Sequence, residues 1–82
     1  MQIILSKDAL KHFEHFPKSE QSKIRKKLLT LLENPTSGKK LSGQLDGLRS
    51  LRSWPYRIVY KINAFEHRIE VSDIIHRQGA YK

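Results

Sequence analysis

Apolar and polar residues recur along this chain with two different periods, and the change of period separates strands from helices. Residues 2–5 read QIIL, a short apolar run that predicts a strand. Ser6 is a suitable N-cap for a helix over 7–15, in which the apolar side chains fall on one side. Pro17 ends this helix because proline lacks the N–H group that a helix interior requires.

A second helix is predicted from residue 19 or 20 to residue 33. Its apolar residues follow the spacing i, i+4, i+7, i+8, which is typical of an amphipathic helix. These residues are Ile24, Leu28, Leu31 and Leu32. Lysine and arginine fill most of the remaining positions, and the pair Asn34-Pro35 ends the helix.

The second half of the chain predicts strands. A polar loop with three glycines spans 36–47, and strands follow at about 48–53, 56–63 and 68–75. Short links between these strands favour an antiparallel meander. The element order is β-α-α-β-β-β, so we expect one α+β domain over residues 1–82, with an antiparallel sheet and the two helices packed on one face.

The register of the last two strands follows from their side-chain pattern. Pairing Ile62 with Ile69 places Lys61 opposite Glu70, and both pairs are favourable. A slip of one residue would scramble both faces of the sheet. The connection around Pro55 is less regular than a common hairpin turn, since proline does not suit a primed turn.

This register gathers cations on one face. Continued without interruption, it puts Arg57 opposite Ile74, with His76 as its diagonal neighbour. Simple hairpin pairing then sets Arg52 directly against Arg57, although like charges placed so are destabilising. We therefore expect an anion over the face that the helices leave open. The cationic residues predicted for that face are Arg52, Arg57, Lys61 and His76.

Composition supports an anionic partner. Sixteen Lys and Arg against 8 Asp and Glu give a net charge of +8 and a pI near 10.1, which is typical of a protein that binds a polyanion. An acidic protein partner would satisfy the same charge, and a merely basic soluble protein is the plain alternative. Neither cysteine nor a metal-ligand cluster is present, so we expect no metal and no cofactor. A cytoplasmic protein without membrane contact is predicted, since no apolar run is long enough to span a membrane and MQIILSK lacks a basic leader.

The chain ends in DIIHRQGAYK, which holds further candidate chemistry. His76 is the one candidate here whose ordinary pKa, about 6.5, suits proton transfer near neutrality. Tyr81 stands almost at the end of the chain, where either a stacking or chemical role or a return onto the sheet edge is possible.

Three segments together resemble a known superfamily. They are KKLSG (39–43), GLRSLRSWPYRIVYKI (47–62) and HRQGAY (76–81). They are similar to the RelE/ParE superfamily, the toxins of bacterial and archaeal type II toxin–antitoxin modules. The HR-x-x-x-Y ending is more similar to the RelE-like RNases than to the ParE-like gyrase inhibitors.

The resemblance implies an activity and residue roles. RelE-like toxins enter the ribosomal A site and cut mRNA without metal, through attack of the 2′-OH on the adjacent phosphate. Arg57 corresponds to the arginine that stabilises the phosphorane, Arg77 to the arginine at the scissile phosphate, and Tyr81 to the tyrosine that stacks on a base and is a candidate proton acceptor. His76 is a further catalytic candidate, since some relatives use a histidine near the C-terminus.

The resemblance also departs from the family pattern in one place. Leu48 and Ser50 stand where the best-known member has two lysines. Other cations are then the candidates for binding RNA, namely Arg49, Arg52, Lys61, Lys39 and Lys40.

Partners follow from the same resemblance. They are the ribosome with its mRNA and a cognate antitoxin, acidic and partly disordered, in a toxin–antitoxin hetero-oligomer. Two alternatives stay open: a ParE-like toxin that poisons DNA gyrase, and an inactive module that binds RNA or an acidic protein.

Overall fold

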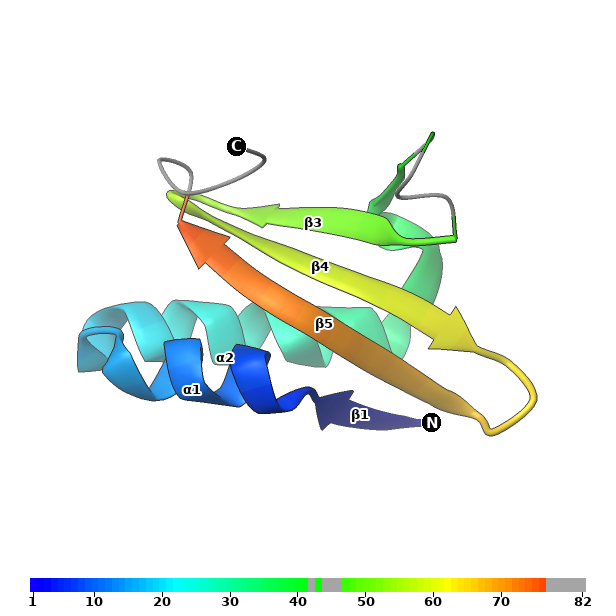
Figure 1. Cartoon of the computed structure of the whole chain (residues 1–82), viewed down its shortest axis with the longest axis horizontal. Helices are drawn as coiled ribbons and strands as arrows, with labels where there is room; N and C mark the ends of the chain where they lie inside the picture. Colours follow the sequence, from blue (N-terminus) through cyan, green and yellow to red (C-terminus); the bar gives the residue numbers. More distant parts are fainter. Residues whose placement is uncertain (42, 44–46, 77–82) are drawn as a thin grey trace.

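The protein is a single sheet lying over a pair of helices (Figure 1). The computed structural model describes residues 1–41, 43 and 47–76. In chain order the elements are β1 (Gln2–Leu5), α1 (Lys7–His15), α2 (Lys18–Glu33), the short 3₁₀ helix η1 (Pro35–Ser37), β2 (Lys39–Lys40), β3 (Arg49–Ser53), β4 (Tyr56–Asn63) and β5 (Arg68–His76). The predicted α+β class is confirmed, and so is the packing of both helices on one face.

The sheet has five strands in the order β1-β5-β4-β3-β2, and it is mixed rather than antiparallel. The meander β3-β4-β5 is antiparallel as predicted. The prediction of a wholly antiparallel sheet was wrong for β1, which runs parallel to β5. Both helices carry the chain across the sheet before the meander begins, and this long crossover is the kind of connection that a parallel pair requires.

The linker after α2 contains a strand that the polar pattern did not predict. Lys39 and Lys40 form β2 and pair with Ser50 and Arg49 of β3. The range 36–47 was predicted as a loop because its glycines and polar residues carry no alternation. Its pairing depends on contacts with residues far along the chain, which a local pattern does not contain.

A side-chain cap holds α1 where the sequence indicated, whereas α2 has none at its N-terminus. Ser6 Oγ accepts a hydrogen bond from the Ala9 amide at 3.0 Å and donates one to the Ser72 carbonyl at 2.6 Å, so the same hydroxyl caps α1 and ties it to β5. The second helix begins at Lys18, slightly earlier than predicted, and Pro17 precedes it. The Gln21 amide group bridges the helices, donating to backbone carbonyls at the end of α1 and the turn that follows.

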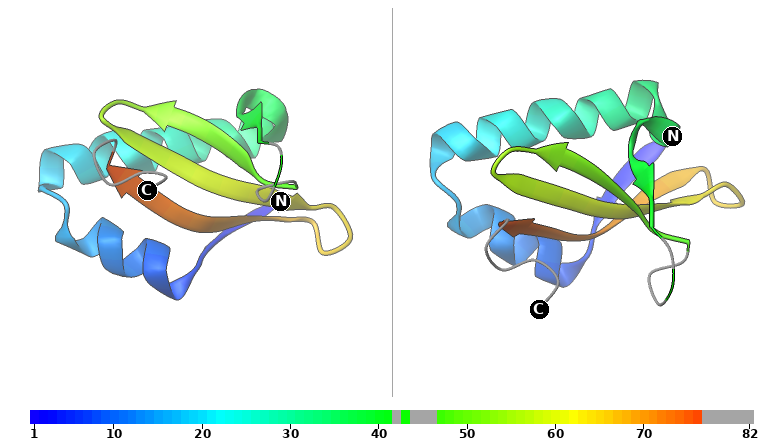
Figure 2. Two further views of the ribbon diagram at one scale, coloured as in Figure 1. Left: turned by 45° about the horizontal axis from the view of Figure 1, so that its top comes forward. Right: turned by 90° about the horizontal axis from the view of Figure 1, so that it is seen from above.

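The hydrophobic core lies between the helices and the sheet, and Figure 2 gives two further views of how these elements are arranged. Its apolar side chains come from the alternate positions of β4 and β5 and from one stripe of each helix. The fully buried ones include Ala9, Ile24, Leu31, Ile58, Tyr60, Ile69, Val71 and Ile74. Positions between them on the strands therefore face the side of the sheet that neither helix covers.

A β-bulge in β5 corrects the predicted register. The pairs Lys61–Glu70 and Ile62–Ile69 are confirmed, but the register shifts between Val59 and Tyr60. Beyond the shift Arg57 pairs with Ile75, so the prediction that it faces Ile74 was wrong.

The bulge removes a conflict that the uninterrupted register contained. Without the bulge, the register would have placed Asp73 among the apolar residues of the helix-covered face. In the structure Ile74 takes that place and is 1% exposed, while Asp73 pairs with Val59. The Asp73 carboxylate accepts hydrogen bonds from the Ile74 amide at 2.8 Å and from Nδ1 of His12 at 2.7 Å. A buried carboxylate is avoided because the strand gains one residue.

Tyr60 joins the linker after α2 to the middle of the sheet. Its hydroxyl donates to the Pro35 carbonyl at 2.7 Å and accepts from the Gly38 amide at 2.9 Å. A Cβ at Gly38 would clash with the Tyr60 hydroxyl, so the close approach requires glycine. Burial raises the pKa of Tyr60 above its ordinary value, and the hydroxyl stays protonated at neutral pH.

Replacing Tyr60 by Phe should destabilise the protein by about 1–3 kcal/mol, because the Gly38 amide is left buried without its acceptor. The measurement is the free energy of unfolding in urea. Tyr56→Phe is the matched control, since the Tyr56 hydroxyl forms no hydrogen bond within the described part of the chain. Equal losses for the two variants would contradict the role given to the Tyr60 hydroxyl.

Candidate functional site

A cationic groove of about 620 Å³ lies on the sheet beside the β2–β3 pair. Four of the cations predicted to act on RNA line it, and serine and leucine residues complete its wall. The described lining residues are Ser37, Lys39, Lys40, Leu41, Ser50, Leu51, Arg52 and Arg57. None of these residues carries a negative charge, so the groove is suited to an anion.

Arg52 and Arg57 both line the groove. They are direct cross-strand partners in the β3–β4 pair, as the hairpin register predicted. The connection between the strands consists of Trp54 and Pro55, whose peptide bond is cis, and pairing continues up to Ser53 and Tyr56. Two guanidinium groups on one face of a hairpin repel each other, and together they offer the forked donors that phosphate oxygens bind.

Alternation sets which cations share this face. Tyr56 and Ile58 point to the helices, and Arg57 between them points to the uncovered face. Lys39 joins that face through its pairing with Ser50 of β3. The groove therefore combines the opposed arginine pair with lysines from a strand that the sequence did not predict.

Arg49 serves another purpose in the structure. Its Nη1 donates to the Gly38 carbonyl at 3.0 Å and to the Thr36 carbonyl at 3.4 Å. It pairs with Tyr60 and so shares the helix-covered side of the sheet. The structure does not bring Arg49 into the groove with Arg57, and its guanidinium instead helps to hold η1 and the start of β2 against the sheet.

Lys61 is likewise separate from the groove. It lies near the opposite end of β4, and its Nζ is 3.5 Å from Oε1 of Glu70. The other carboxylate oxygen of Glu70 accepts from Nε of Arg68 at 2.7 Å. The hydrogen bond from Arg68, with a second from Asn63, holds the pKa of Glu70 below its ordinary value. Lys61 therefore belongs to a small ion-pair network on the sheet.

His76 does not share a face with Arg57, which corrects the predicted arrangement. The bulge makes His76 the partner of Tyr56, and the two rings meet edge to face with centroids 5.3 Å apart. Tyr56 in turn packs on Phe16 at 4.3 Å, on the helix-covered side. Without the extra residue in β5, His76 would have pointed to the side of Arg57.

The remaining catalytic candidates, Arg77 and Tyr81, lie outside the described residues. Among the residues that are described, no group of three or more His, Asp or Glu side chains is placed to hold a metal ion. Within the same part of the chain, neither helix has the length and apolar character needed to cross a membrane.

Two groove residues were missed in the sequence. Ser37 and Ser50 line the groove with hydroxyl groups that can donate to an anion. Ser50 stands two residues before Arg52, so the strand period would have placed it on the same face. No local signal indicated Ser37, because its position depends on the bonds that Tyr60 makes with the linker.

The fold and the groove define a small basic α+β domain with a cationic groove on the sheet face that neither helix covers. Comparison with known proteins gives its family. The family model described as the ParE toxin of the type II toxin–antitoxin system parDE matches residues 3–81. The chain belongs to this family, within the RelE/ParE superfamily of type II toxins.

Individual relatives support this assignment. Toxin RelE of Mycobacterium tuberculosis is 43% identical over 53 residues, which are 63% of this chain and 55% of the relative. The match thus spans about half the length of that relative. The isolated E. coli RelE toxin superimposes with a TM-score of 0.75 at 26% identity, over 90% of this chain and 81% of that one. The toxin–antitoxin complex RelBE2 from M. tuberculosis gives a TM-score of 0.86 at 22% identity, over 93% of this chain and 96% of that one, which shows a shared fold.

Replacing Arg52 by Gln should stabilise the folded protein by about 0.2–1 kcal/mol at low ionic strength, because a directly opposed like charge is removed. The gain should shrink as salt screens the pair. Urea unfolding at two salt concentrations measures both effects. Lys18→Gln, which removes one exposed charge outside the groove, is the control. A gain no larger than that of Lys18→Gln would show that the arginine pair stores no repulsion.

Replacing Glu70 by Gln should lower stability at neutral pH, because the ionised carboxylate is bound by Arg68, Asn63 and Lys61. The pKa of Glu70 is lower in the folded than in the unfolded protein. Its contribution is thus complete above the ordinary carboxyl range and is lost as pH falls through the folded-state pKa. Thermal unfolding from neutral to acid pH should show the two proteins converging at the acid end. A gap that stays constant with pH would contradict this.

Proposed function

We propose that this toxin is a ribosome-dependent endoribonuclease that cleaves mRNA in the ribosomal A site. The observation that carries the proposal is the opposed pair Arg52–Arg57, which lines a cationic groove on the uncovered sheet face. A sheet face with cations and no helix over it is suited to an unpaired RNA segment, since proteins read RNA mostly where it is single-stranded. The relatedness to Toxin RelE of M. tuberculosis supports the same activity.

The proposed reaction is an internal transfer at one phosphate. The 2′-oxygen of a nucleotide attacks the adjacent phosphorus, and the bond from phosphorus to the 5′-oxygen breaks. The 2′-hydroxyl gives up its proton and the departing 5′-oxygen gains one. The products are a 2′,3′-cyclic phosphate end and a 5′-hydroxyl end, and the reaction consumes no water in this step.

Arg57 is the proposed catalytic residue for charge. Negative charge on the non-bridging oxygens grows as the fifth bond to phosphorus forms. A guanidinium held on a strand is preorganised to donate to those oxygens. Arg52 and the two lysines of β2 would hold the flanking phosphates, because they line the same groove.

Proton transfer is assigned through the family resemblance. Tyr81 is the proposed acceptor of the 2′-hydroxyl proton, and Arg77 the proposed aid to the leaving group. Neighbouring arginines would lower the pKa of a tyrosine, which favours this role. His76 is the less favoured candidate, because its contact with Tyr56 lies on the helix-covered side while a phosphate at Arg57 would lie on the other.

The family model that matches the chain favours one alternative. It describes ParE toxins, and the ParE-like members of the superfamily poison DNA gyrase. A polyanion groove would serve a gyrase–DNA complex as well as an mRNA. The two functions differ in the nucleic acid that is broken, so one experiment on the products separates them.

An antitoxin is the proposed protein partner. RelBE2 of M. tuberculosis was solved as a toxin–antitoxin complex, and the net charge of +8 here is suited to an acidic chain. On α2, Leu29 is 58% and Leu32 is 37% exposed beside lysines, which is the pattern that an amphipathic acidic partner would cover. The proposed place of action is the cytoplasm, where translating ribosomes and the antitoxin meet.

The test adds the purified protein to translating ribosomes and maps the mRNA ends. Cleavage should fall within codons and leave 2′,3′-cyclic phosphate ends. Arg57→Ala should lower the single-turnover rate by about 10²–10³, the loss typical of removing one donor that stabilises a charged transition state. Lys7→Ala, an exposed change on α1, should leave the rate near that of the unchanged protein.

Two outcomes would contradict the proposal. Equal losses in the Arg57 and Lys7 variants would remove Arg57 from the active site. Intact mRNA in cells in which DNA breaks accumulate would assign the chain to gyrase instead.

A further inference from the structure

A second cationic groove lies between α2 and β3, next to the one that holds Arg57. Its volume is about 670 Å³. None of its described lining residues is acidic, and they come from one face of α2 and from the end of β3. They are Lys23, Lys26, Lys27, Thr30, Arg52, Ser53 and Trp54. Among these residues, the proposed reaction gives a role to Arg52 alone.

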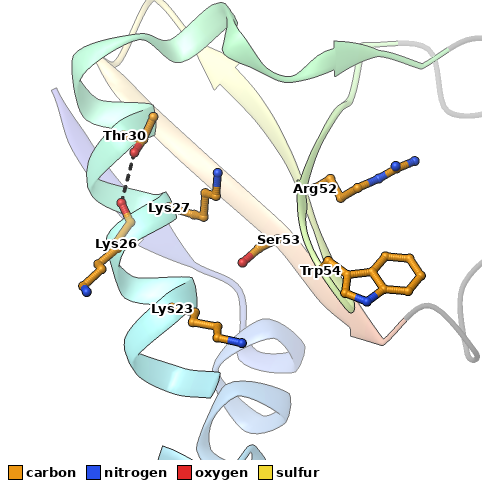
Figure 3. Close-up of a pocket in the computed structure, with 7 residues that line it drawn as sticks. All are labelled: Lys23, Lys26, Lys27, Thr30, Arg52, Ser53 and Trp54. Carbon is orange, nitrogen blue, oxygen red and sulfur yellow. Dashed lines mark hydrogen bonds between the residues drawn. The ribbon is translucent and has the colours of Figure 1, made fainter. Parts of the chain in front are cut away.

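The two grooves meet at Arg52, which lines both of them. Figure 3 shows Ser53 pointing toward α2, whereas Arg52 and Trp54 extend on the other side of the strand. Lys23 and Lys27 extend from α2 toward the gap. Cations therefore continue from the sheet face, over the end of β3, to the helix.

The edge of β3 is open at this point. Only Arg49 and Ser50 pair with β2, so within the described residues no strand borders the edge of β3 opposite β4 from Leu51 onward. A polymer chain that leaves the Arg57 groove can thus cross β3 at Arg52 without meeting another strand. A longer β2 would have blocked this crossing.

Trp54 lies next to the point where such a polymer chain would cross β3. Its side chain belongs to the β3–β4 connection, and the residue is 60% exposed. An exposed indole next to an arginine offers a flat surface on which a base can stack, and stacking tolerates any base. The lysines of α2 are then placed for the phosphates that follow, as point charges on flexible stems.

We infer that the α2–β3 groove binds the single-stranded RNA segment that flanks the scissile one, with its base stacked on Trp54 and its phosphates at Lys23 and Lys27. The inference rests on the proposed function, since it takes RNA to be the polymer over Arg57. The site would hold the substrate on both sides of the bend at Arg52 and would add affinity without base specificity. Its residues are binding residues and take no part in the chemistry.

The test measures binding of uridine oligonucleotides with blocked 2′-oxygens (2′-O-methyl), which stay intact whether or not the protein is a nuclease. A short probe of about four nucleotides covers one groove, and a long one of about twelve can reach both. The long probe should bind more tightly than the short one. Trp54→Ala should weaken the long probe about fivefold or more and leave the short one unchanged, while Trp54→Phe should keep most of the affinity.

The lysines are tested through salt dependence, because a Trp54 variant alone could disturb the turn. The double variant Lys23→Ala, Lys27→Ala should lower the slope of log affinity against log salt by about 1 for the long probe. Lys7→Ala with Lys11→Ala removes the same charge from α1, outside both grooves, and should change the slope far less.

Three results would overturn the inference. The first is equal binding of the short and long probes, and the second is an equal effect of the two lysine pairs. The third is displacement of the long probe by an acidic peptide more readily than by competing RNA. The first two leave the proposed nuclease intact if ribosome-bound mRNA is still cut. If ribosome-bound mRNA is not cut although both probes bind as expected, the result refutes the proposed function alone.

Discussion

The hydroxyl of Tyr60 is the contact on which the groove depends. The helices lie on one side of the five-stranded sheet. Its edge strand β2 follows α2 in the chain and must therefore be brought back from the end of that helix to the sheet. Tyr60 does this from the centre of the sheet by bonding the Pro35 carbonyl and the Gly38 amide, and Arg49 bonds the Gly38 carbonyl from the same side. Tyr60 and Arg49, whose side chains face the helices, therefore determine where the lysines of the linker lie relative to Arg57.

The bulge in β5 has the opposite effect, because it separates groups that an uninterrupted register would have brought together. It moves Asp73 out of the core, brings Ile74 in, and turns His76 toward Tyr56. A histidine beside the Arg57 groove would have offered an acid and a base within the described strands. With His76 on the far side, the charged groups among the described residues of the groove are guanidinium and ammonium groups, which stabilise charge but do not exchange protons near neutrality. Catalysis on this face then needs a proton acceptor from elsewhere in the chain, and Tyr81 is the one that the resemblance supplies.

Much of this architecture follows from periodicity in the sequence. Period-two alternation in YRIVYKI assigns Tyr60 to the core and Arg57 to the opposite face, and the Ser6 cap marks the start of α1 to the residue. The bulge, the parallel pairing of β1 and the short β2 were not predictable in the same way. Each depends on a contact between segments distant in sequence, such as Ser6 with Ser72 or Gly38 with Tyr60. Asp73 was nonetheless a sign of irregularity, since it interrupted an otherwise apolar alternation.

The opposed arginines show how the small size of the domain bears on its chemistry. A chain of this length buries only about 60% of its unfolded surface, so its core is thin. In the described part of the chain, neither helix covers the second sheet face. An apolar face there would invite association with other chains, whereas cations keep it solvated. The charges repel each other, and Arg52 next to Arg57 is the most direct case. In the proposed function, an RNA phosphate placed between them would turn that repulsion into attraction, so that binding would be strengthened by an interaction that weakens the free fold. Arg52 would do this for both proposed sites, because it lines both grooves where the β2–β3 pairing has ended and the strand edge is open.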